Sequence, residues 1–111
     1  MRPDVEAATE RVLSARARLG RAPERDDLSD DVEDALCEGY AQALAGDAWL
    51  TDGERRLHEL IDDTSLAFRG REVRELAREH ADFQRQVINL RYELEALRRE
   101  HDRLRSRSSA A

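Results

Sequence analysis

Few residues of this sequence have types and spacing that suggest chemistry, and the best-spaced pair is His58 and Asp62. Side chains four residues apart lie on one face of a helix and can share a metal ion. A zinc site needs at least three protein ligands, and no third ligand lies nearby in the sequence. We therefore interpret His58 and Asp62 as a solvated surface pair, and we expect no metal site and no cofactor.

The only thiol, Cys37, is the next candidate for chemistry. A catalytic thiolate requires a positive neighbour, whereas Cys37 is followed by Glu38. The chain also lacks a glycine-rich phosphate loop and a nucleophile elbow, so we expect no enzyme activity. One cysteine excludes an intrachain disulfide, and no apolar run approaches the ~18 residues that span a bilayer. We expect a cytoplasmic protein that does not enter a membrane.

The other two histidines belong to a regular pattern of apolar residues in the C-terminal third. From Val73 onward, residues of this pattern recur every three and four positions, which is the spacing of coiled-coil a and d positions. A helix of period 3.6 would drift by ~20° per heptad, so a pattern this regular indicates a coiled coil. The predicted seam, which is also the predicted dimer interface, consists of Val73, Leu76, His80, Phe83, Val87, Leu90, Leu94, Leu97, His101 and Leu104.

The length of this seam predicts what covers it. At 1.5 Å per residue, a helix over 71–106 is about 54 Å long, whereas the helices expected upstream have only about 16 residues each. Helices of that length do not cover the distal part of the seam, so we predict that a second copy of the chain does. The alternative is that the long helix folds back onto its own chain as a four-helix bundle.

The charges beside the seam predict the direction of the second copy. In a parallel pair, each g position faces the next e position of the partner, which joins Glu93 to Arg98 and Glu100 to Arg105. An antiparallel pair would set Glu against Glu and Arg against Arg. Leu at four of the five d positions further favours two strands. The sequence thus predicts a parallel homodimer.

His80 and His101 occupy a positions of the seam. A polar a residue can fix the register and the number of strands, and this is the favoured interpretation. The second interpretation is a pH-sensitive seam, because two imidazolium ions that face each other repel.

Residues 73–104 resemble a leucine zipper, with Phe83 interrupting the leucines. The bZIP transcription factors carry a basic region directly before their zipper. Here that place holds Glu59, Asp62 and Asp63. The resemblance therefore implies a helix that pairs, and not one that reads DNA.

Three shorter helical patterns precede the zipper, over about 3–19, 30–45 and 51–68. We interpret Gly20 and Gly46 as the residues that end the first two helices. Thr51 and Glu54 match a capping box that begins the third. The predicted fold class is all-α, with a small acidic domain of about three helices over 1–68, a coiled-coil helix over 71–106 and a disordered tail over 107–111.

Charge is distributed unevenly along the chain. Residues 1–70 contain 9 Arg and 17 acids, and residues 71–111 contain 10 Arg and 8 acids. A domain that binds duplex DNA needs a surplus of positive charge, so we expect no sequence-specific DNA binding. The candidate docking acids for a basic partner are Asp26, Asp27, Asp30, Asp31, Glu33 and Asp34. The alternative interpretation is a solvated helix start whose acids suit the helix dipole.

These observations predict a non-enzymatic homodimeric coiled-coil interaction or adaptor protein with an acidic helical head. Its expected partners are a second copy and, as a second candidate, a basic protein. All 19 basic residues are Arg, which is typical of a GC-rich bacterial genome. A regulator of transcription that works through protein contact is the first alternative, and a structural or scaffolding component is the second.

Overall fold

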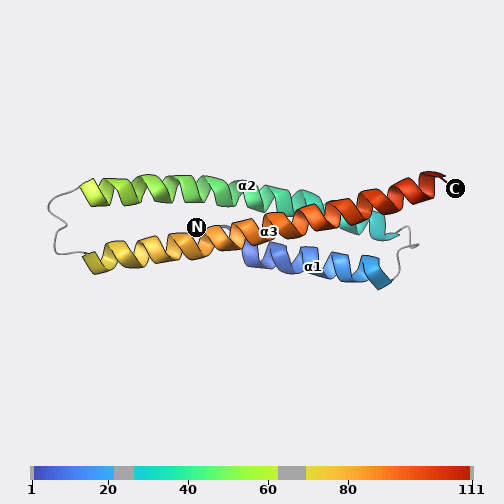
Figure 1. The fold of residues 1–111 in the computed structure, drawn as a ribbon, viewed down its shortest axis with the longest axis horizontal. Helices are drawn as coiled ribbons and strands as arrows, with labels where there is room; N and C mark the ends of the chain where they lie inside the picture. The colour runs from blue at the N-terminus through green and yellow to red at the C-terminus, as the bar shows by residue number, and fades with distance from the viewer. Residues whose placement is uncertain (1, 22–26, 63–69, 111) are drawn as a thin grey trace.

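A computed structural model of the chain describes residues 2–21, 27–62 and 70–110, with side chains for all of them except Asp27 and 108–110. It contains three helices, α1 (Val5–Arg21), α2 (Asp27–Asp62) and α3 (Gly70–Ala110). No strand occurs in these described ranges, which confirms the all-α class. The molecule is a rod of 68 × 19 × 18 Å. Helices α2 and α3 run antiparallel along it, and α1 lies beside one half of the pair, parallel to α3 (Figure 1).

Helix α1 packs as its sequence predicts, but it begins at Val5 and continues through Gly20, which was predicted to end it. The carboxylate of Asp4 accepts a hydrogen bond of 3.0 Å from the backbone amide of Ala7, so Asp4 caps the first turn. The apolar residues at three- and four-residue spacing are all buried: Val5, Ala8, Val12, Ala15 and Leu19.

Helix α2 differs from the prediction, because it continues through Gly46 and Thr51 where a helix end and a new helix start were expected. Gly39, Gly46 and Gly53 follow one another at seven-residue spacing and therefore share one stripe of α2. A Cβ atom on Gly39 would overlap the side chain of Leu94, and one on Gly46 would lie 2.8 Å from Val87. These glycines do not end a helix; they let α3 approach the backbone of α2 closely.

The seam of α3 is closed from within the chain. Six of its residues are buried between α1, α2 and α3: Phe83, Val87, Leu90, Leu94, Leu97 and His101. The premise that the chain has no helix long enough to cover them is wrong, because α2 has 36 residues and is about 54 Å long. While the bundle holds, these six residues do not face a second copy.

The buried core joins residues on both sides of position 70. The predicted boundary between an N-terminal domain and a separate coiled-coil helix therefore falls inside one packed unit. Residues 107–110, for which the sequence predicts disorder, continue α3 as its last turn. Residue 111 and the expected break near 63–69 lie outside the described residues.

Because of the close packing at the glycine stripe, replacing one of its glycines with alanine should destabilise the protein, although helix propensity alone favours alanine. Alanine is favoured over glycine in a helix by about 1 kcal/mol, and overpacking a tight core costs about 1–3 kcal/mol. A Cβ on Gly46 meets the stiff, branched Val87. Gly46→Ala should therefore lower the free energy of unfolding, measured by urea denaturation followed by circular dichroism.

Gly20→Ala is the matched control, because a Cβ there would meet no atom within 4 Å. It should raise the free energy of unfolding by up to about 1 kcal/mol. Equal gains in the two variants would show that α2 and α3 do not need a glycine to pack.

Candidate functional site

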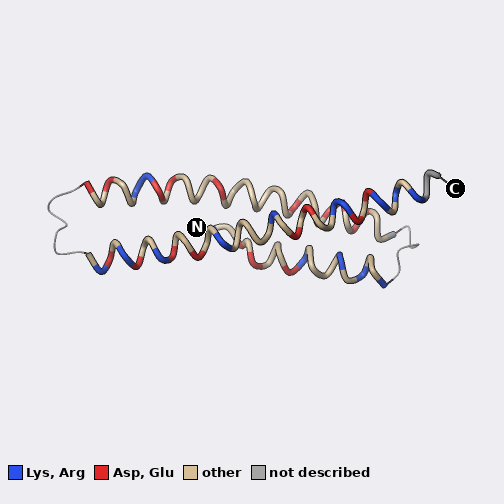
Figure 2. The backbone as a smooth tube through the Cα atoms, in the orientation of Figure 1, with Lys and Arg blue, Asp and Glu red and all other residues tan. Residues whose placement is uncertain are grey.

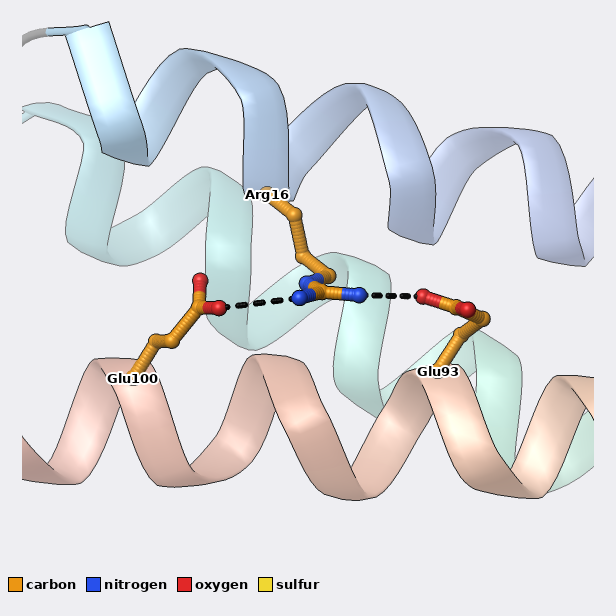
Figure 3. Close-up of polar contacts among 3 residues, drawn as sticks. All are labelled: Arg16, Glu93 and Glu100. Atoms are coloured by element: carbon orange, nitrogen blue, oxygen red, sulfur yellow. Dashed lines mark hydrogen bonds and ion pairs between the residues drawn. The ribbon is translucent and has the colours of Figure 1, made fainter.

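Two acids of α3 hold α1 in place. Arg16 of α1 donates hydrogen bonds to Glu93 at 2.5 Å and to Glu100 at 3.0 Å (Figure 3). The bond to Glu100 and then that to Glu93 raise the pKa of Arg16 above its ordinary value. All three side chains are 30% exposed or less, so the contact is partly shielded from water. The g-position acids that the sequence assigns to Arg98 and Arg105 of a second copy are thus paired with Arg16 of α1.

Acids of α2 pair with the opposite flank of α1. Arg11 is hydrogen-bonded to Glu38, and Arg18 lies 3.4 Å from Asp31. Helix α1 therefore lies between acids of α2 and acids of α3, with arginines directed toward both. We call the surface of α2 and α3 that α1 covers the α1 seat.

The predicted docking acids are only partly free for a basic partner. Asp31 pairs with Arg18, and Glu33 lies 3.9 Å from Arg105 of α3. Asp30 and Asp34 are exposed. Asp26 and the side chain of Asp27 lie outside the described residues. Figure 2 shows acidic positions near the start of α2 facing a helix end of α3 rich in arginine.

Half of the α2–α3 pair extends beyond α1, and we call this part the arm: residues 47–62 of α2 and 70–82 of α3. Val5 lies at the level of Gly46, since its methyl would be 3.5 Å from a Cβ there. On this face of the arm, no third helix follows among the described residues (Figure 1). Instead there is a groove of about 220 Å³ lined by Trp49, Gly53, Arg56, Leu57, Leu60, Leu76, Glu79 and His80.

The groove continues the α1 seat. Glu79 lies at the same heptad position as Gln86 and Glu93, which contact Glu6 and Arg16 of α1. On α2, Trp49 lies two heptads after Ala35, a residue that lines the α1–α2 junction. The positions of α2 and α3 that hold α1 are therefore repeated along the arm, where none of the three described helices covers them.

The floor of the groove is held by aromatic contacts. The imidazole Nε2 of His80 lies 2.8 Å from the backbone oxygen of Leu50 and donates to it. The His80 ring stacks on Trp49 with centroids 6.4 Å apart, and Trp49 meets Phe83 edge to face at 4.8 Å. These contacts link α2 to α3 across the floor of the groove.

Neither seam histidine is paired with a second imidazole in this structure. His80 lies over Gly53 of α2. His101 is buried, and its Nε2 lies 3.1 Å from the hydroxyl of Ser29. The pH-sensitive interpretation required two facing imidazoles, and inside the bundle each of these rings has an intramolecular partner instead.

The sequence did not predict the groove, because Trp49 and Leu50 fall between the helices predicted over 30–45 and 51–68. A signal was present, however. Beyond Gly46, the three- and four-residue spacing of α2 continues without a break, through Leu50, Gly53, Leu57 and Leu60. Counting glycine as a seam residue would have predicted one long helix with a seam that reaches its end.

The other hollows and polar clusters of the described residues are weaker candidates for a functional site. A wide hollow of about 650 Å³ between α1 and the end of α3 contains Arg16, whose charge Glu93 and Glu100 already balance. Among the residues with assigned positions, no three His, Cys, Asp or Glu side chains gather as metal ligands. Cys37 is exposed. Within the same ranges, every helix is too polar or too short in its apolar stretch to cross a membrane.

Comparisons with known proteins reveal no relative of this chain. No family model, no curated protein and no solved structure matches the chain. What the groove can hold is therefore inferred from its own contacts, burial and charge.

The contact of Arg16 with Glu93 and Glu100 should make a measurable contribution to stability. Arg16→Met removes the charge, keeps much of the apolar stem and leaves two carboxylates facing each other. We expect a loss of about 1–3 kcal/mol in the free energy of unfolding. Glu93→Gln should cost less in the Arg16→Met background than in the wild type, with a coupling of at least about 0.5 kcal/mol. Additive losses in this double-mutant cycle would contradict the contact.

Proposed function

We propose that this protein is a non-enzymatic interaction or adaptor protein whose arm groove binds an amphipathic helix. The observation that carries the proposal is the uncovered continuation of the α1 seat. Trp49, Leu57, Leu60 and Leu76 line it, and Leu76 is 43% exposed. Apolar side chains left open in a preformed groove are typical of helix-binding surfaces, which accept the apolar stripe of a partner helix.

Helix α1 indicates the chemistry of the helix that would fit. It combines an apolar stripe of small and medium side chains with arginines directed at acids on both flanks. The groove provides Glu79 on its α3 edge and, on its α2 edge, Arg56, which lies 3.1 Å from Asp52. A helix with an apolar stripe and charges of both signs beside it matches these edges.

The predicted parallel homodimer through the whole seam requires α1 and α2 to leave α3 and expose six buried residues. We still propose an interaction protein, but we place its contact surface on the arm. Of the predicted interface residues, Val73, Leu76 and His80 lie on the arm, and Leu76 and His80 line the groove.

The chain contains one tryptophan, Trp49, and it reports directly on the groove. The probe is a synthetic peptide with the sequence of residues 3–21, which copies the helix that the adjoining seat holds. Added to dilute full-length protein, it should change the emission of Trp49 along a saturable curve. Leu57→Glu should weaken this binding at least tenfold, which corresponds to about 1.4 kcal/mol.

Ile88→Glu is the matched control, because Ile88 is 61% exposed and is not among the groove residues. It should bind the peptide as the wild type does. Unchanged Trp49 emission up to millimolar peptide, or equal binding by the Leu57→Glu variant, would contradict a helix-binding groove.

A further inference from the structure

The arm presents both an exposed apolar side chain and the groove that could receive one. Leu76 is 43% exposed at the edge of the groove, and beside it Gly53 leaves the floor without a side chain. A contact between two identical copies requires one surface that carries both complementary parts. The arm meets this requirement.

We infer that the occupant of the arm groove is the arm of a second copy, so that two arms pack in opposite directions as a four-helix bundle. This inference rests on the helix-binding function proposed above and names its partner. In such a bundle, Leu76 of each copy lies against the groove of the other, and two hairpins cover the apolar face that each leaves open alone.

Charges of both signs on the arm allow two arms to meet. The arm carries nine acids and five arginines, whereas residues 27–46 of α2 carry six acids and no arginine, and Asp31, Glu33 and Glu38 among these six already pair with arginines of α1 and α3. On the arm, both signs lie within a few residues of each other, as with Arg56 and Asp52 on α2 and with Arg74 and Glu79 on α3. A reversed copy can therefore set opposite charges against one another.

Sterics decide the direction. Helix α1 lies on the same face of the α2–α3 pair as the groove, and its first residue, Val5, lies where the groove begins. Two arms packed in the same direction would press the two α1 helices together and hold the arms apart. Two arms packed in opposite directions place each arm tip near the start of the other copy's α1. The acidic parts then lie at the two far ends.

The estimated area of the contact indicates whether the dimer is permanent or reversible. Sixteen residues of arm are about 24 Å long, and the rod is 19 Å wide. Each arm then offers somewhat under 500 Å², so the total lies near the lower limit of about 1,000 Å² for a specific interface. We therefore expect a reversible dimer and not a permanent one.

Sedimentation equilibrium of the full chain over a wide concentration range tests the inference. The average mass should rise from 12.7 kDa toward twice that value as concentration increases. Leu76→Glu should keep the protein monomeric. Leu76→Gln, a milder change at a partly exposed site, should weaken the dimer several-fold while the helical circular dichroism and the urea midpoint stay near those of the wild type. Ile88→Glu should dimerise normally.

Small-angle scattering of the concentrated protein tests the direction. Two rods of 68 Å that overlap along their arms give a longest dimension of about 110 Å. A longest dimension near 68 Å, a constant mass of one chain, or a Leu76→Gln dimer as strong as the wild type would each overturn the inference. If the mass stays at one chain while the 3–21 peptide still changes Trp49 emission, the groove binds helices and the second copy is not its partner. If both measurements fail, the proposed function fails as well.

Discussion

The close antiparallel contact of α2 with α3 is the constraint on which the other features of this protein depend. It is made where Leu94, Val87 and His80 meet Gly39, Gly46 and Gly53. Each glycine opposes helix formation by about 1 kcal/mol relative to alanine. The helix persists because backbone-level packing along this seam removes large side chains of α3 from water. A shorter α2 would leave most of α3 uncovered.

Because α2 and α3 pack closely, they together form a surface on which a third helix lies. Helix α1 occupies that surface over about half of its length, with Arg16 between Glu93 and Glu100. The heptad repeat that builds the surface does not stop where α1 begins. It continues to Leu60 on α2 and to Val73 on α3. An uncovered groove on the arm therefore follows from having one helix that is much shorter than the other two.

The charged residues between the helices hold α1, α2 and α3 together more than they form a surface for a partner. The acids of α2 that suggested a dock for a basic partner are in part paired with Arg11, Arg18 and Arg105. Exposed pairs of this kind contribute little stability each. Their arrangement nevertheless matches the side of α2 on which α1 lies.

The sequence by itself determined that the chain is helical and which stripes of α1 and α3 are buried, because the spacing of apolar residues is a local property of the chain. It also predicted that Glu93 and Glu100 pair with Arg98 and Arg105 of a parallel second copy, whereas both acids pair with Arg16 of α1 in the structure. Only the tertiary structure decided that α1 fills this place. A heptad pattern predicts that a stripe of side chains is buried. It does not predict whether the same chain or a second copy buries it. Gly46 has the same ambiguity, since a glycine ends a helix or admits a neighbour depending on what packs beside it.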